Sequence, residues 1–376
     1  MAPPIQGICA PEFEAVKTAF EMNFAALNEI GASVAISQNS ELVVDLWGGY
    51  LDEARTQPWQ ENTLVNVWSS TKPMAAMCLL VLADRGDVDL HAPVSKYWPE
   101  FAQNGKDAVE VRHFLSHSAG LSGMEAPVES EALYDWDWMT GALARQAPWW
   151  EPGSQSGYHA LTQGYLIGEV VRRVTGQSLG QFYAMEIAGP LAADFHIGTT
   201  EAVDERVSNV IPPSSPIDVA NDDSIASRTF RNPAVDARVA NTRGWRAAEI
   251  PAANGQGNAR SIVRAQTPMA CGGQAFGKTI LSSNGARRIF EKQTSGLDLA
   301  LGIPVTFGMG YGLSSDPVPL GPNPHIAYWG GYGGSIILVD QDARLCFSYV
   351  MNRMEAGLVG DLRGFNLLQA MYQSVA

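Results

Sequence analysis

The sequence predicts an α/β protein whose antiparallel sheet is built from both ends of the chain, with a mainly helical domain inserted between them. Two observations indicate this architecture. Runs with strand character occur at 33–47 and again between 325 and 351, and an amphipathic helix accompanies each group. The middle of the chain is largely helical. We therefore expect an α/β domain formed by residues 1–85 and 265–376, and an inserted helical domain with long loops at 86–264.

The first ninety residues are predicted to form a helix, a hairpin and a second helix. The segment 11–30 begins with a proline, which suits the first helical position, and Gly31 is expected to end it. Strands are expected at 33–37 and 42–47. A second helix follows Ser69. The apolar residues on one face of the first helix are Phe13, Val16, Phe20, Phe24 and Leu27.

The middle of the chain is predicted to consist of helices and irregular segments. Residues 111–121 are typical of a short helix that runs into a glycine turn. A longer helix is expected to open at Tyr158 and to end at Thr175, with Gly176 as its C-cap. The segment 201–260 is rich in proline, asparagine, aspartate and glycine. Long excursions of this kind often border a functional site.

The C-terminal part returns to strands. Runs at 325–331, 335–339 and 345–351 favour a meander, and the last two are joined by a short polar turn. A closing helix is expected at 360–373.

Charge and composition exclude several classes of function. The 376 residues carry a net charge of −14, which repels phosphate backbones and anionic membranes, so we expect no nucleic-acid or membrane partner. The N-terminus lacks the pattern of a signal peptide, and no apolar run reaches transmembrane length. The four cysteines are far apart, without metal-like spacing. We therefore expect a cytoplasmic protein without a metal or cofactor.

The chain is organised around the stretch Ser69-Ser70-Thr71-Lys72. Ser69 lies at the mouth of an apolar helix, and Lys72 stands one turn away on the same face. A serine hydroxyl is a poor nucleophile until a base takes its proton, and a desolvated lysine can act as that base. The helix N-terminus also directs backbone N–H groups toward negative charge that forms there. The alternative is an N-cap serine followed by a solvated lysine.

Two other patterns compete with this site. Gly176-Gln177-Ser178-Leu179-Gly180 matches the nucleophile elbow of α/β-hydrolases, but that motif needs a strand before the serine, and here a helix precedes it. Ser178 and Gln181 instead favour a capping box. His113 and His117 have a spacing of four, but no third ligand motif accompanies them, so His117 is expected to hydrogen-bond backbone in the turn.

Two later stretches support the Ser69 site. Gly157-Tyr158-His159-Ala160 places a tyrosine after a Pro-Gly turn. The stretch 329–335, Trp-Gly-Gly-Tyr-Gly-Gly-Ser, forms a glycine-rich strand end that another molecule can approach closely. Taken alone, each stretch also fits a structural role, as a buried aromatic residue or a loosened strand.

With these residues in place, the chain resembles the serine β-lactamase and penicillin-binding-protein superfamily, and most closely its esterase branch, the family VIII carboxylesterases. The superfamily pattern is Ser-x-x-Lys, then Tyr-x-Asn or Ser-x-Asn, then Lys-Thr-Gly. The corresponding stretches here are 69–72, Tyr158-His159-Ala160 and Trp329-Gly330-Gly331. The resemblance spans nearly the whole chain and implies a β-lactamase-like fold.

Two departures from the pattern bear on the substrate. Ala160 replaces the asparagine of the second motif, and Trp329 replaces the lysine of the third. In the superfamily that lysine pairs with the carboxylate of a β-lactam or peptide. Its loss argues against a dedicated β-lactamase or peptidase, and a tryptophan fits a neutral, apolar group.

The resemblance implies a carboxylesterase for short-chain or small neutral esters. Ser69 would be the nucleophile, and Lys72 and Tyr158 would share its proton, with the choice of base left open. The backbone N–H groups of Ser69 and Tyr332 would form the oxyanion hole. Trp329, Gly330 and Gly331 would bind substrate. The alternatives are a β-lactamase, amide hydrolase or acyltransferase of the same superfamily, or a catalytically silent binding protein. The sequence does not determine the oligomeric state.

Overall fold

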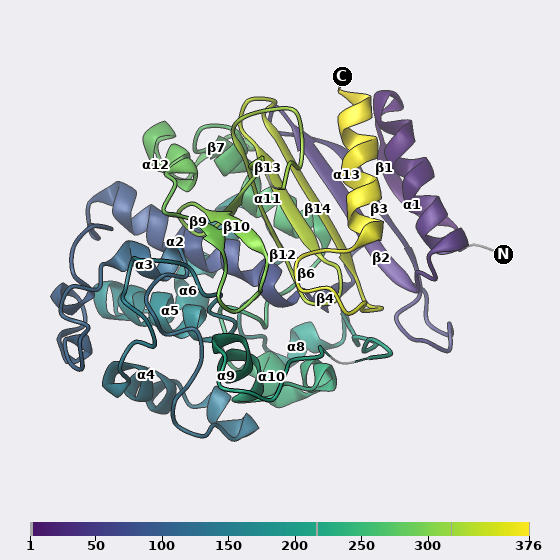
Figure 1. Cartoon of the computed structure of the whole chain (residues 1–376). Helices are drawn as coiled ribbons and strands as arrows, with labels where there is room; N and C mark the ends of the chain where they lie inside the picture. The colour runs from purple at the N-terminus through teal and green to yellow at the C-terminus, as the bar shows by residue number, and fades with distance from the viewer. Residues whose placement is uncertain (1–2, 216, 317, 376) are drawn as a thin grey trace.

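A computed structural model describes residues 3–215, 217–316 and 318–375 (Figure 1). The largest element is a sheet in the order β1-β3-β2-β14-β13-β12-β11-β10-β9, in which every described pair of neighbouring strands is antiparallel. Its strands are β1 (Ile5–Cys9), β2 (Gly31–Gln38), β3 (Glu41–Gly49), β9 (Thr294–Leu297), β10 (Pro304–Phe307), β11 (Gly312–Leu313), β12 (Ile326–Gly330), β13 (Ile336–Asp340) and β14 (Leu345–Met351).

The two ends of the chain meet at the centre of this sheet. In the register, β2 pairs with β14 so that Val34 lies opposite Tyr349 and Ala35 opposite Ser348. Both strands are almost completely buried, which explains why they read as continuous apolar or small-residue runs rather than as an alternating pattern. The predicted antiparallel sheet built from both termini is confirmed.

Helices cover both faces of the sheet. Helices α1 (Glu14–Ala26) and α13 (Leu362–Ser374) pack against each other on one face, and α11 (Ala259–Ala270) packs on β2, β13 and β14 from the other (Figure 1). Small residues of β2 face α11, because the Ser37 hydroxyl lies 2.6 Å from that of Thr267 and Ser33 accepts the N–H of Ala259. Hydroxyl contacts therefore join helix and sheet where larger side chains would keep them apart.

Most of the remaining helices lie beside the sheet, in the left and lower part of Figure 1. Helix α2 is buried along nearly its whole length, and α5, α6 and α12 pack against it. Short strands occur at β4 (Leu64–Asn66), β5 (Val207–Ser208), β6 (Gln256–Gly257), β7 (Gln274–Ala275) and β8 (Lys278–Thr279). The helices are α2 (Lys72–Arg85), α3 (Val111–Leu115), α4 (Trp136–Arg145), α5 (Thr162–Thr175), α6 (Leu179–Tyr183), α7 (Gly189–Leu191), α8 (Glu201–Asp204), α9 (Ile225–Arg231), α10 (Arg243–Ala247) and α12 (Ser283–Arg287).

Several boundaries differ from the sequence prediction. The first helix ends at Ala26, and Gly31 opens β2 instead of capping the helix. Strand β1 was not predicted; it is a short edge strand interrupted by a glycine, which gives little periodic signal. The division of the chain at 85, 86, 264 and 265 stays a prediction, and α11 spans its last boundary.

Among the described residues, no helix is both long and apolar enough to cross a membrane. The same residues contain no cluster of three or more histidine, cysteine, aspartate or glutamate side chains arranged for a metal ion.

Candidate active site

Ser69 lies in a short 3₁₀ turn, Trp68–Thr71, that leads directly into α2. Trp68 adopts a left-handed conformation with φ of 48°, which is uncommon for a bulky residue and marks a strained entry into the helix. Ser69 remains partly exposed, whereas Lys72 is only 1% exposed. The site therefore presents a reachable hydroxyl above a lysine that is enclosed by protein.

The amine of Lys72 has three neighbours at hydrogen-bond distance. Its Nζ lies 3.1 Å from Ser69 Oγ, 2.8 Å from the carbonyl oxygen of Ala160 and 2.9 Å from that of Ala252. No carboxylate of the described chain forms a salt bridge with it, and burial holds the pKa of Lys72 well below its usual range. A neutral amine suits these neighbours, because its two N–H bonds can serve the two carbonyls while its lone pair accepts the serine proton.

Tyr158 reaches the same hydroxyl from the other side. Its phenol donates to Ser69 Oγ at 2.5 Å. The Lys72 Nζ atom lies 4.6 Å from the centre of the Tyr158 ring. Burial raises the pKa of Tyr158, so the phenol stays protonated in the free protein. The Lys72 amine lies over the ring face of Tyr158, and burial has the largest effect on the pKa of this phenol.

The prediction that Tyr158 opens a helix is wrong. Helix α5 begins at Thr162, and Tyr158 lies in the extended segment before it. The predicted end of that helix is confirmed, since Gly176 is a left-handed C-cap. The Ala160 side chain, at the place of the superfamily asparagine, takes no part in the polar network, but its carbonyl holds Lys72.

Trp329 packs behind Tyr158. A small apolar cluster, separate from the main core, contains both residues together with Ala300, Val305 and Phe307. The ring centres of Trp329 and Tyr158 are 5.3 Å apart, and Trp329 is only 2% exposed. Its buried indole N–H has no hydrogen-bond partner among the described residues, and Trp329 offsets part of the effect of burial on the pKa of Tyr158. In this structure Trp329 therefore supports Tyr158 from behind.

The glycine-rich turn that follows β12 lies directly against the start of α2. A Cβ atom on Gly331 would lie 2.3 Å from the carbonyl oxygen of Val67 and 3.3 Å from the amide nitrogen of Ser69. Ser335 reinforces this approach by donating to the carbonyl of Val67 at 2.9 Å. No hydrogen bond of the described residues uses the N–H of Tyr332, the residue that follows Gly331.

The competing serine is a helix cap. The side chain of Ser178 accepts from the N–H of Gln181, and Gln181 returns the bond to the N–H of Ser178, which forms the predicted capping box at the start of α6. The Ser178 hydroxyl also donates to Glu249. The Ser178 hydroxyl therefore has a structural role both as an acceptor and as a donor.

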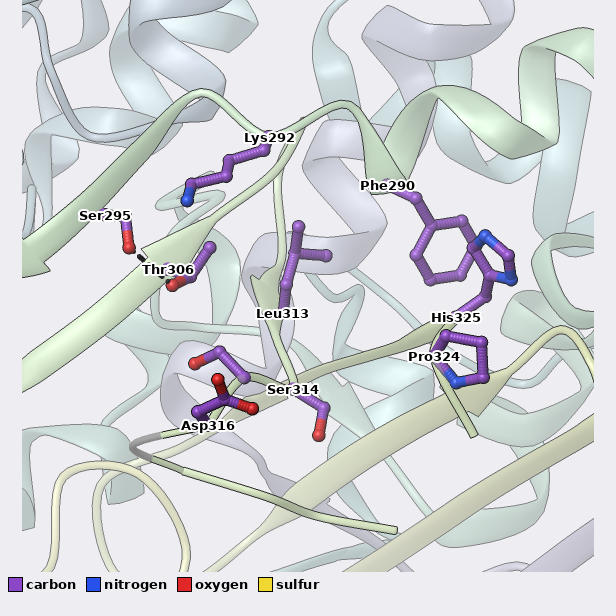
Figure 2. Close-up of a pocket in the computed structure, with 10 residues that line it drawn as sticks. Phe290, Lys292, Ser295, Thr306, Leu313, Ser314, Asp316, Pro324 and His325 are labelled. Atoms are coloured by element: carbon purple, nitrogen blue, oxygen red, sulfur yellow. Dashed lines mark hydrogen bonds between the residues drawn. The ribbon is translucent and has the colours of Figure 1, made fainter. Parts of the chain in front are cut away.

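A hollow in the described part of the chain lies away from Ser69. It has a volume of about 460 Å³ and opens along β9, β10 and β11, where Phe290 faces His325 and Ser295 contacts Thr306 (Figure 2). Its lining contains none of the residues around Ser69. The contacts of Ser69, rather than cavity size, identify the candidate site.

Two residues near Tyr158 were not predicted to take part in the site. His117 accepts the N–H of His159 at Nδ1, as expected for a backbone contact in its turn, and its ring lies 4.9 Å from that of Tyr158. Asp298 accepts the N–H of Tyr158 at 3.0 Å. Asp298 stands 140 residues away and reads as an ordinary turn residue, so no sequence signal could have identified it.

Comparison with known proteins places these observations in context. Residues 20–370 match the family model described as Beta-lactamase. The chain is 34% identical to Esterase/beta-lactamase LipL of Mycobacterium tuberculosis (strain ATCC 25618 / H37Rv) over 94% of this chain and 84% of that one. It is 26% identical to Esterase EstB of Burkholderia gladioli over 89% of this chain and 88% of that one.

A solved structure agrees over nearly the full length. The crystal structure of a family VIII carboxylesterase superposes with a TM-score of 0.94 at 42% identity and covers 99% of this chain and 100% of its own.

Proposed function

The chain belongs to the β-lactamase family, within the family VIII carboxylesterases, and from this premise we propose that it hydrolyses short-chain or small neutral carboxylic esters through an acyl-enzyme on Ser69. One observation carries the proposal. The hydroxyl of Ser69 lies within hydrogen-bond distance of both the Lys72 amine and the Tyr158 phenol, at 3.1 and 2.5 Å. A serine placed between a potential base and a potential acid is the arrangement that acyl transfer requires.

In the proposed acylation step, Ser69 Oγ attacks the ester carbonyl and its proton passes to the amine of Lys72. The tetrahedral oxyanion is held by the backbone N–H groups of Ser69 and Tyr332. The phenol of Tyr158 then donates its proton to the departing alkoxide, and the Lys72 ammonium returns a proton to the phenolate. Water releases the acid by the same route in reverse.

The directions of the two pKa shifts support this division of roles. Burial without a carboxylate lowers the pKa of Lys72, which favours a neutral amine as the resting base. Burial raises the pKa of Tyr158, which favours a protonated phenol as the acid. The pair shares one proton network, so its titration in a rate profile belongs to both residues together.

The surroundings of Tyr158 favour a neutral substrate. Partly buried apolar side chains from several segments pack on the Tyr158–Trp329 cluster; these are Ala160, Ile225, Phe230, Leu301 and Val359. In the superfamily pattern a lysine occupies the position of Trp329. A substrate carboxylate beside Trp329 would therefore lack a cationic partner. An ester with apolar groups loses nothing there.

The proposal is tested with a series of p-nitrophenyl esters of increasing acyl length, measured beside nitrocefin. We expect the highest kcat/KM for short acyl chains and a value for nitrocefin lower by at least about a hundredfold, as when a site lacks one charged partner for its ligand. Comparable values for nitrocefin and p-nitrophenyl butyrate would favour the β-lactamase alternative. The absence of any turnover or covalent serine labelling would favour the silent binding protein.

A further inference from the structure

Each backbone N–H group of residues 157–159 donates a hydrogen bond to a residue from another part of the chain. The N–H of Gly157 donates to the carbonyl of His117 at 2.9 Å, that of Tyr158 to Asp298 Oδ1 at 3.0 Å, and that of His159 to His117 Nδ1 at 3.0 Å. Three consecutive donors thus end on two residues from distant parts of the chain. Since Tyr158 precedes α5, helical hydrogen bonds do not fix the backbone of this segment.

Asp298 reaches this segment from the connection between β9 and β10. The same Oδ1 atom also accepts the N–H groups of Ala300 at 3.0 Å and Leu301 at 2.9 Å, so the carboxylate shapes its own turn while it holds Tyr158. The N–H of Leu299 adds a second link to the segment by donating to the carbonyl of Ser156 at 3.0 Å. Asp298 is fully buried, and no salt bridge of the described residues involves it.

His117 holds the opposite side. It adopts a left-handed conformation with φ of 56°, and its ring packs at a tilt, with centres 4.9 Å from the ring of Tyr158 and 4.8 Å from that of Phe307. Because Nδ1 accepts a backbone N–H, we assign the ring proton of the neutral imidazole to Nε2, which lies 3.3 Å from the side-chain amide nitrogen of Gln163. Burial holds the pKa of His117 well below its usual range, so this acceptor is present at neutral pH.

We propose that Asp298 and His117 are positioning residues that clamp the backbone of residues 157–159 and thereby place the Tyr158 phenol on Ser69. The inference rests on the proposed role of Tyr158. A short phenol-to-serine contact of 2.5 Å leaves little tolerance, and displacement of a reacting group by about 1 Å can lower a rate by about a hundredfold. Asp298 and His117 touch neither the substrate carbonyl nor Ser69 in this account, so their effect passes through Tyr158.

The first test removes the acceptor at 298 and then restores it. Asp298→Ala should lower kcat by about a hundredfold with a much smaller change in KM, since the placement of an acid and not substrate binding is disturbed. Asp298→Asn keeps an oxygen at the Oδ1 position and should recover kcat to within about tenfold of the wild type. Asp340→Ala is the matched control: Asp340 is also a buried turn aspartate, which accepts from Ala343, Asn323 and Tyr372 away from the site. It should lower the melting temperature and leave kcat unchanged.

The decisive readout is the same change in a Tyr158→Phe background. If Asp298 acts through the phenol, Asp298→Ala should have almost no further effect on kcat once the phenol is gone. An equal loss in both backgrounds, or a loss in Asp340→Ala as large as in Asp298→Ala, would overturn the clamp. A Tyr158→Phe variant with full activity would instead overturn the proposed mechanism, which keeps the two failures distinguishable.

If Asp298→Ala does not fold, a second pair of variants, at His117, tests the same proposal. Asparagine tolerates the left-handed backbone and carries an oxygen near the place of Nδ1, so His117→Asn should retain far more kcat than His117→Ala. Equal losses in the two variants, measured on folded protein, would contradict a role for the Nδ1 acceptor.

Discussion

Two buried lysines, Lys72 and Lys106, sit in nearly the same kind of environment. Each donates to two backbone carbonyls: Lys72 to Ala160 and Ala252, and Lys106 to Gln103 and Gln146. Neither forms a salt bridge within the described chain, and burial lowers the pKa of both. Burial lowers the pKa of Lys106 to about 8 and holds that of Lys72 well below its usual range.

The difference between them is the third neighbour. Lys72 has the hydroxyl of Ser69 at 3.1 Å, whereas Lys106 lies over the ring of Phe101, 5.1 Å from its centre. Lys106 ties two loops together. A depressed lysine pKa is therefore no sign of catalysis by itself. What distinguishes Lys72 is its contact with the hydroxyl that we propose as the nucleophile.

The largest effect is expected when Ser69 is removed. Lys72 then keeps only its two backbone carbonyls, as Lys106 has. Ser69→Ala should lower ester hydrolysis by at least about 10⁴-fold, the scale of loss when a covalent nucleophile is deleted. Ser178→Ala is the control, because Ser178 caps α6, and it should lose about 1 kcal/mol of stability while keeping most activity. Activity that survives in Ser69→Ala and disappears in a folded Ser178→Ala would show that the other serine is the nucleophile.

The next largest effect should separate the two lysines directly. Lys72→Met should lower kcat by about 10³-fold, as loss of a positioned base does. Lys106→Met should leave kcat unchanged, because the contacts of Lys106 with two backbone carbonyls and the Phe101 ring lie outside the candidate site. Lys72→Arg should not restore activity, since a guanidinium stays protonated. Initial rates on p-nitrophenyl acetate, with melting curves for each variant, measure this. Similar rates for the two methionine variants would contradict the comparison.

A smaller effect is expected from combining changes at the site. Because Lys72 and Tyr158 both contact Ser69 Oγ, they should act as one unit, and the double variant Lys72→Met/Tyr158→Phe should be within about tenfold of the worse single variant. The wild-type rate should fall toward acid pH as the pair takes up a proton. Losses that multiply in the double variant would mean that the two residues act independently.

Much of this site could be predicted from the sequence. Ser69 and Lys72 are three residues apart at a helix start, so local geometry alone brings them together. The approach of the 329–335 stretch to Ser69 follows from its glycines, although the structure places the Val67 backbone against Gly331. Trp329 was expected to contact substrate, and in this structure it is buried behind Tyr158.

What could not be predicted depends on contacts between distant segments. Tyr158 was placed at a helix start because an apolar helical pattern follows it, but the amides of 157–159 bond to His117 and Asp298 instead. The second carbonyl partner of Lys72, Ala252, lies in the irregular 201–260 segment, where a main-chain acceptor leaves no trace in residue type. Backbone acceptors and single turn aspartates carry no pattern that identifies their distant partners.

The smallest predicted effect concerns stability. The pKa of Lys106 is about 8 in the folded protein against 10.5 as the ordinary value. Between these values the unfolded chain binds a proton that the folded protein does not, so the free energy of unfolding should rise with pH by up to ~1.4 kcal/mol per unit from this residue. Urea unfolding at pH 8.0, 9.0 and 10.0 should show a weaker rise for Lys106→Met than for the wild type. Identical slopes would contradict the lowered pKa of Lys106.

The proposed mechanism requires Lys72 to be a neutral amine when it faces Ser69. The chain has six lysines, so [¹³Cε]lysine labelling gives a simple spectrum in which Lys72→Met and Lys106→Met assign the two resonances of interest. The Lys72 resonance should have the chemical shift of a neutral amine at pH 7, while that of Lys106 should titrate near pH 8. A Lys72 resonance that keeps the shift of an ammonium group up to about pH 10, near the ordinary lysine value, would contradict its role as the resting base.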